Sequence, residues 1–157
     1  MLARIRKSIE DKDQGFTLIE LLVVMIIIGI LAAIAIPVFL SQRAKARDTA
    51  TKSDVSTVGK EISSYYVDGT GSLAIAISSG TYSLTETPAV AGAAAIATSK
   101  VSDGTEVKTA TIVYSDTTNK AGSWCVALTN PNGTKKDWQY SAKTGLTQGA
   151  CTTAGTY

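Results

Sequence analysis

The chain has 157 residues, a formal net charge of +2 and no histidine. This length allows one modest domain and an anchor, and the near-neutral charge gives no strong field for recruiting nucleic acid or acidic partners. Without histidine, histidine-based triads and nearly all zinc sites are excluded. The sequence also has no Walker loop, nucleophile elbow or metal-ligand spacing. We therefore expect no enzyme activity, no catalytic residues, no metal, no cofactor and no specific binding of nucleic acid.

A basic leader precedes a long apolar segment. Arg4, Arg6 and Lys7 carry positive charge with no acid among the first seven residues, and the three acids and one lysine of residues 10–13 then offset most of it. Positive charge before an apolar span keeps the N-terminus of a membrane protein in the cytoplasm. We therefore expect the part of the chain beyond Leu40 to be exported.

The apolar segment covers residues 16–40 and contains one charged side chain, that of Glu20. As a helix this segment would span about 38 Å, against about 30 Å for the hydrocarbon core of a bilayer. A charge at the bilayer centre costs roughly 2.5–3.5 kcal/mol on insertion scales, so such a carboxylate usually has a partner. No basic residue lies near Glu20 on the same helix face, so we expect the partner to come from elsewhere. A free amine made by cutting the chain after Gly15 is the most economical candidate.

Three interpretations of this segment compete. A secretory signal peptide is the first, because residues 33–35 (A-I-A) have the form of a cleavage site, but the apolar stretch before them is too long and contains Glu20. A plain single-pass anchor explains the length and the leader but not the positions of Glu20 and Gly15. The third interpretation, which we favour, is cleavage between Gly15 and Phe16. Because Gly15 has no side chain, the backbone there can be extended and reachable by a protease.

The residues around this boundary resemble a known motif. The block GFTLIELLVV at residues 15–24, continued by GILAAIA at residues 29–35 and by Pro37, resembles the prepilin motif of type IV pilins and the related pseudopilins. The resemblance covers the N-terminal third of the chain. It implies a cleaved leader at residues 1–15 and N-methylation of Phe16 by a membrane-embedded prepilin peptidase. It also implies that Glu20 pairs with the Phe16 amine of a neighbouring subunit during assembly.

The same resemblance implies a structural role. The subunit would sit in the cytoplasmic membrane as a single-pass precursor and then polymerise through its N-terminal helix into an extracellular type IV pilus filament. An assembly ATPase and a platform protein would be its partners. Two alternatives stay open: a pseudopilin of a type II secretion or competence apparatus, and a membrane-anchored binding domain that never polymerises. Many pseudopilins have an acid-rich calcium loop and lack a C-terminal disulfide, so the scattered acids and the two cysteines of this chain favour a pilin.

One long helix is predicted over residues 16–67. It is apolar on all sides up to Leu40, becomes charged over residues 43–52, and then carries an apolar stripe suited to packing on a sheet. The stripe consists of Val55, Val58, Ile62 and Tyr65. Two helix breakers, Gly29 and Pro37, mark weak points, and in similar pilins the stretch between these positions loses helical order in the filament.

Strands are predicted over residues 107–114, 123–129 and 136–142, separated by turn-like residues at 119–122 and 130–133. We expect Trp124, Trp138 and Tyr140 in the core. Between residues 68 and 100 the sequence predicts no regular element, except that residues 88–95 suggest a surface loop or a short helix. The prediction is an α+β chain: a membrane-spanning stem at 16–40, and a head at 41–157 in which the lower helix packs on three to four antiparallel strands.

Two cysteines, Cys125 and Cys151, lie in the part that we expect to be exported. An even pair in an oxidising compartment predicts a disulfide, although two free buried thiols would fit the count equally well. Closing a loop of this length would stabilise the fold by about 3.5 kcal/mol in the chain-entropy model. Similar pilins hold their C-terminal segment in this way. The isolated acids Asp68, Asp103 and Asp116 are expected in solvated loops.

Overall fold

The computed structural model describes residues 15–88, 94–109 and 112–152. Its internal contacts divide the chain into two units, residues 1–40 and residues 41–157. Residues 1–14 of the leader, the Ala-rich residues 89–93 and residues 110–111 of a predicted strand lie outside the described residues.

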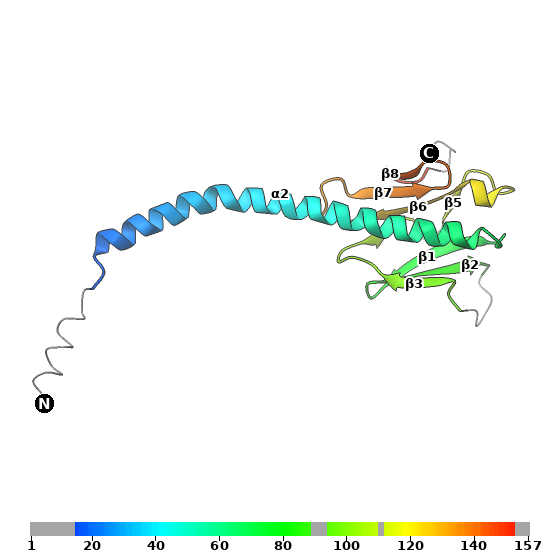
Figure 1. Cartoon of the computed structure of the whole chain (residues 1–157), viewed down its shortest axis with the longest axis horizontal. Coiled ribbons are helices and arrows are strands. Elements are labelled where there is room, and N and C mark those ends of the chain that lie inside the picture. The colour runs from blue at the N-terminus through cyan, green and yellow to red at the C-terminus, as the bar shows by residue number, and fades with distance from the viewer. Residues whose placement is uncertain (1–14, 89–93, 110–111, 153–157) are drawn as a thin grey trace, which may run out of the picture. The chain divides into compact units, whose positions relative to one another are not determined.

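Helix α2 spans Leu18–Tyr65 and confirms the predicted helix to within two residues at each end (Figure 1). It ends where the N–H of Gly69 donates to the carbonyl of Tyr65, at a distance of 2.8 Å. The helix runs unbroken through Gly29 and Pro37, so a loss of helical order at these residues in a filament stays a prediction.

The strands form two antiparallel sheets instead of the single sheet predicted (Figure 1). The first has the order β1-β2-β3, and the second the order β4-β6-β7-β8, with β5 also paired to β6. The bounds are β1 Ser72–Ser78, β2 Thr81–Thr87, β3 Ala97–Lys100, β4 Glu106–Val107, β5 Val113–Tyr114, β6 Trp124–Thr129, β7 Asp137–Ser141 and β8 Gly145–Gln148.

The prediction of three to four strands was therefore wrong in number, and the first sheet is the main omission. In β1 the buried residues Leu73 and Ile75 alternate with Ser and Ala. Because Ala is itself weakly apolar, the contrast between the two faces of this strand is small in the sequence. A hairpin turn of two residues, Ser79 and Gly80, joins β1 to β2, and both have positive φ, at 51° and 70°. A two-residue hairpin turn of this kind requires positive φ at both of its residues. The Ser-Gly pair was the feature of the sequence that could have indicated the hairpin.

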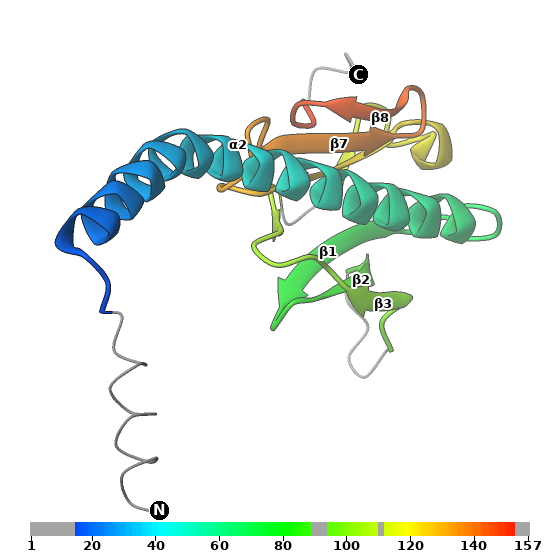
Figure 2. The same ribbon diagram turned by 60° about the vertical axis from the view of Figure 1, so that its left-hand side comes forward.

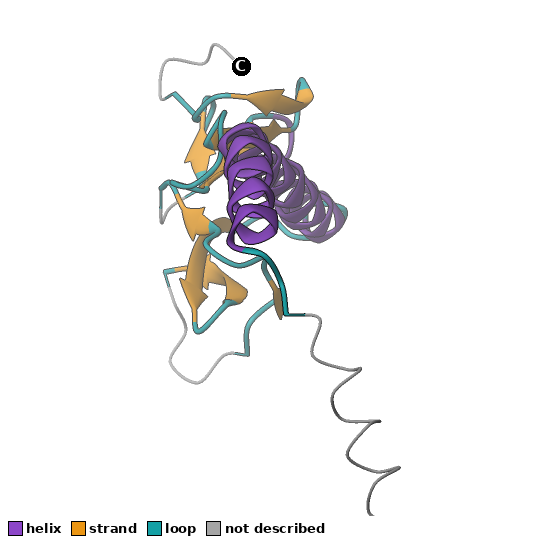
Figure 3. Cartoon of the chain, turned by 90° about the vertical axis from the view of Figure 1, so that its left-hand side faces the viewer, coloured by secondary structure: helices purple, strands orange, loops and turns teal. Residues whose placement is uncertain are grey.

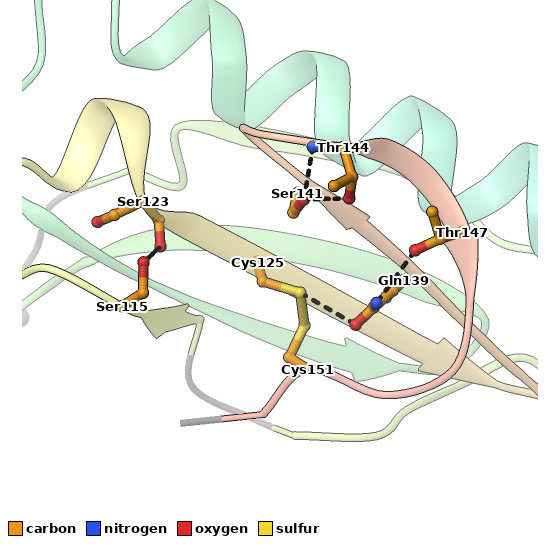
Figure 4. Close-up of a disulfide and its surroundings, with 8 residues drawn as sticks. All are labelled: Ser115, Ser123, Cys125, Gln139, Ser141, Thr144, Thr147 and Cys151. Carbon is orange, nitrogen blue, oxygen red and sulfur yellow. Dashed lines mark hydrogen bonds between the residues drawn. A yellow bond between two sulfur atoms is a disulfide. The ribbon is translucent and has the colours of Figure 1, made fainter. Parts of the chain in front are cut away.

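The predicted strand over residues 107–114 is in fact two short strands, β4 and β5. The predicted strand 123–129 corresponds to β6, and both of its faces are covered. On one face Trp124 is buried, and on the other Cys125 is covered by its bond to Cys151 and by Gln139 (Figure 4). The two-sided burial arises because the C-terminal segment crosses back over the sheet.

In the head, the lower part of α2 packs against the sheets as one layer on another (Figures 2 and 3). Val55, Val58 and Ile62 are fully buried, which confirms the predicted stripe, while Tyr65 is half-buried. Among the predicted core aromatics, Trp124 and Trp138 are buried. Tyr140 is half-buried and stacks on Trp124 with a centroid distance of 5.8 Å.

A tyrosine cluster holds the end of α2 where the two sheets meet. The hydroxyls of Tyr66 and Tyr114 are 2.6 Å apart, and the N–H of Leu73 in β1 donates to the Tyr114 hydroxyl. Burial, and then the hydrogen bond with Tyr114, raise the pKa of Tyr66. Since Tyr114 belongs to β5 and Leu73 to β1, the cluster links one sheet to the other.

Two aspartates of α2 hold loops of the head, which the sequence did not predict. Asp48 was expected on a charged surface, but its side chain is 6% exposed and both of its oxygens accept the N–H of Lys135. Asp54 accepts hydrogen bonds from the N–H and hydroxyl of Ser102 and from the hydroxyl of Thr105. These acids therefore pair with loop donors that are distant in sequence.

The disulfide between Cys125 and Cys151 is present, with a Cα–Cα distance of 5.8 Å (Figure 4). It ties β6, inside the second sheet, to the segment that follows β8. The alternative of two free thiols is thus wrong.

Candidate processing and assembly site

The expected cleavage bond, Gly15–Phe16, lies outside the helix. Residues 15–17 are not helical, and α2 begins at Leu18. A Cβ added to Gly15 would meet nothing within 4 Å, and Phe16 is 91% exposed. Both residues are therefore accessible, and a protease would not have to unwind a helix to reach the bond. Cleavage there and N-methylation of Phe16 stay predictions.

Glu20 accepts hydrogen bonds from Thr17, the residue just before the helix, and the expected cationic partner from a neighbouring subunit stays a prediction. Its Oε2 accepts the backbone N–H of Thr17 at 2.9 Å and the Thr17 hydroxyl at 2.7 Å. In return, the backbone N–H of Glu20 donates to the Thr17 Oγ1 at a distance of 3.3 Å. This reciprocal arrangement is a capping box, which satisfies donors that the first turn of a helix leaves unpaired.

The sequence contained the signal for this arrangement. Thr17 precedes Glu20 by three residues at the start of an apolar run, which is the S/T-x-x-E pattern of a capping box. Within the described residues, the Oε1 of Glu20 accepts no recorded hydrogen bond and remains available to another partner.

The apolar segment of α2 exposes its side chains on every side. In the single subunit, its large apolar residues from Leu21 to Leu40 are each about half exposed or more. Burying such a side chain is worth about 1.5–3 kcal/mol, so leaving the whole segment in water would be very unfavourable. In length and composition α2 is able to span a membrane. Lipid or other apolar helices must therefore cover this segment.

The remaining acids of the described chain form no second site. Asp68, Asp103 and Asp116 are exposed, as predicted. Hydrogen bonds from the hydroxyl and N–H of Thr118 hold the pKa of Asp116 below its usual range. Within residues 15–88, 94–109 and 112–152, no three Cys, Asp or Glu side chains are grouped so as to hold a metal ion.

Comparison with known proteins identifies the N-terminal segment. The model of the prokaryotic N-terminal methylation motif matches residues 11–36. The chain is 39% identical over 57 residues to the type II secretion system core protein G of Pseudomonas aeruginosa, covering 36% of this chain and 40% of that protein. It is 47% identical over 47 residues to the type IV major pilin protein PilA of Myxococcus xanthus, covering 30% of this chain and 21% of that protein. It is 46% identical over 55 residues to the type IV wide pilus major component PilA4 of Thermus thermophilus, covering 35% of this chain and 42% of that protein.

The chain thus spans about two fifths or less of the length of these relatives, and no solved structure matches it. The relatives are pilus and secretion-system components, and none is named as an enzyme. The chain thus carries the prokaryotic N-terminal methylation motif, and its N-terminal third is similar to that of type IV pilins and of a type II secretion core protein. In this chain the motif leads into a long apolar helix and a disulfide-bonded antiparallel head.

Proposed function

We propose that this protein is the structural subunit of a type IV pilus filament. The observation that carries the proposal is the apolar helix segment that begins three residues after Gly15 and is exposed on all sides in the single subunit. A helix that is apolar all round is stable only when lipid or other helices surround it. Lipid surrounds it in the precursor, and copies of the same helix surround it in the filament.

Processing prepares the subunit for assembly. A prepilin peptidase cuts after Gly15 and methylates the new N-terminus at Phe16, two residues before the first helical residue. The cut removes the basic leader and creates an amine. The new positive charge lies at the end of an apolar segment, where it requires a counter-ion as much as Glu20 does.

Glu20 then guides the docking of the incoming subunit. In the single subunit its Oε2 is bound to Thr17, which orients the carboxylate at the first turn of the helix. The Phe16 amine of an incoming subunit pairs with this carboxylate in a low-dielectric bundle, where an ion pair is stronger than at a surface. A subunit docked out of register would leave both charges unpaired, so the pair favours one axial position.

The precursor is placed in the cytoplasmic membrane with its N-terminus in the cytoplasm, and the assembled filament lies outside the cell. An assembly ATPase and a platform protein move subunits from the membrane into the filament. Gly29 and Pro37 are the positions at which the helix loses order most easily in the filament, since Gly is a weak helix former and Pro lacks a backbone donor.

A pseudopilin of a type II secretion apparatus is the second candidate, because one relative is a core protein of such a system. The disulfide between Cys125 and Cys151 favours the pilin. The third candidate, a membrane-anchored binding domain, would not polymerise at all.

Two measurements on sheared surface material test the proposal. Electron microscopy should show long filaments, and intact mass with N-terminal sequencing of their subunit should give a methylated chain that starts at Phe16. A start at Ile36 would favour a signal peptide, and a start at Met1 a plain anchor. A stable membrane-bound monomer without filaments would support the binding domain, and short filaments seen only on overexpression would favour the pseudopilin. Replacing Gly15 with Leu should leave uncleaved precursor in the membrane.

A further inference from the structure

Exposed basic side chains cluster near the point where the charged part of α2 begins. Arg43, Lys45 and Arg47 lie on the helix, and Lys135 and Lys136 lie in the loop between β6 and β7. All five are exposed or, for Arg47, half-exposed. We call these five residues the basic cluster.

The buried Asp48 brings the two parts of the cluster together. Its two carboxylate oxygens each lie 3.0 Å from the backbone N of Lys135, so the loop is docked on the helix at residue 48. Buried Gly133 lies beside the same carboxylate, where a side chain would collide with it. A helix rises 1.5 Å and turns about 100° per residue, so Arg43 is only about 7.5 Å from Asp48 along the axis, while Lys45 points to the opposite side of the helix from Arg43 and Arg47. The helix cations and the loop lysines therefore form a band of positive charge around the start of the charged part of α2.

The cluster has little opposing charge. None of its five cations forms a recorded salt bridge within the described residues, where the one ion pair joins Lys108 to Asp137 at 3.2 Å. That pair engages Asp137, the acid next to Lys136 in sequence. The other nearby acid, Asp48, is buried and occupied by Lys135. The side chains that reach solvent here are thus mainly cationic.

We propose that the basic cluster binds anionic phospholipid headgroups of the bilayer leaflet that faces the head. Arg43 follows Leu40, the last apolar residue of the stem, by three residues, or about 4.5 Å of helix. The attraction of Lys and Arg to an anionic bilayer decays within a Debye length, about 8 Å at physiological salt. Charge complementarity and this proximity point to lipid as the occupant.

The contact holds the head at the bilayer surface while the subunit waits in the membrane, and it is lost when the subunit enters a filament. This inference rests on the membrane-inserted stem of the proposed function but not on polymerisation. It can therefore be tested on the single subunit.

The test uses the full chain in lipid nanodiscs, with a nitroxide on Asn132→Cys. Because the native cysteines are bonded to each other, the new thiol is the reactive one, and Asn132 is exposed in the docked loop. Relaxation of the nitroxide by a nickel-chelating lipid reports its proximity to the headgroups. We expect strong relaxation when phosphatidylglycerol is present, weak relaxation in phosphatidylcholine alone, and loss of the difference in high salt.

The decisive comparison uses two double variants of equal charge. Each cation near an anionic surface strengthens binding about fivefold, so Lys135→Gln with Lys136→Gln should lower the ratio of docked to undocked label about 25-fold. Lys100→Gln with Lys143→Gln, two exposed lysines outside the cluster, should change it little.

Equal relaxation in both lipids, or equal loss in both double variants, would overturn the inference. A chain that fails to enter nanodiscs would instead contradict the inserted stem itself, so the two failures are distinguishable.

Discussion

The two ends of α2 have opposite relations to the rest of the protein. Residues 18–40 leave nearly all of their apolar side chains exposed, whereas Val55, Val58 and Ile62 of the same helix are fully buried under the sheets. One continuous helix thus includes a segment whose partners lie outside the subunit and a segment whose partners are supplied by the head. Changes in the first segment should affect assembly, and changes in the second should affect folding stability.

The largest expected effect is on assembly. Glu20→Ala should leave leader cleavage, membrane insertion and the thermal midpoint of the head unchanged, because among the described residues the side chain of Glu20 forms hydrogen bonds with Thr17 and with no residue of the head. Surface filaments should be few or absent, since the incoming amine loses its counter-ion. The measurement is surface filament yield relative to the membrane pool of subunit. Normal filaments from this variant, in a background without other pilins, would refute the pairing of Glu20 with Phe16.

The next largest effect separates the head from the stem. Replacing Cys125 and Cys151 by Ser should lower the free energy of unfolding of the head by about 3.5 kcal/mol, because the bond closes a long loop. Denaturant unfolding of the detergent-solubilised chain, followed by Trp fluorescence, measures this change. The helicity of the stem should not change. Equal unfolding midpoints for the oxidised wild type and the double variant would contradict the expected contribution of the bond.

A pair of glycine substitutions tests the contrast within the helix itself. A Cβ on Gly59 would lie 2.5 Å from Cγ and Cδ1 of Tyr140, whereas one on Gly29 would meet nothing within 4 Å. Gly59→Ala should therefore destabilise the head by about 1–3 kcal/mol through overpacking. Gly29→Ala should stabilise the stem helix by up to about 1 kcal/mol through helix propensity and leave the head unchanged. Thermal unfolding measured by near-UV and far-UV circular dichroism distinguishes the two. Equal effects of both substitutions on the head would show that the contrast is wrong.

The smallest effect is a dependence of head stability on pH. The hydrogen bond from Thr129, and next Lys108, hold the pKa of Asp137 below its usual range. A lowered pKa in the folded state means that the unfolded chain binds more protons, so this contribution is present above the ordinary Asp pKa of about 3.9 and is lost on acidification below it. The thermal midpoint should therefore fall as the pH is lowered from about 4 towards about 2. The thermal midpoint of the Asp137→Asn variant should fall less steeply over that pH range than that of the wild type. An identical slope for the two proteins would exclude Asp137 as a contributor.

Much of the architecture could be predicted because the relevant signals are local. The long apolar run and the stripe after it specified the helix to within two residues, and β6 and β7 carry the Trp, Val and Tyr residues typical of strands. The first sheet was missed because Ser, Thr and Ala in β1 and β2 dilute the alternation that marks a strand. The capping box of Thr17 and Glu20 was readable in principle, since its donors and acceptors lie within one helical turn.

The sequence by itself determined the processing motif, the apolar stem, the helix and the presence of a cysteine pair, because each depends on residue type and spacing along one stretch of chain. Only the tertiary structure decided which residues meet across long separations. Asp48 accepts the N–H of Lys135, 87 residues away, and Tyr114 meets Tyr66, 48 residues away. No local pattern encodes such pairs, because they arise only when distant segments pack on a shared core.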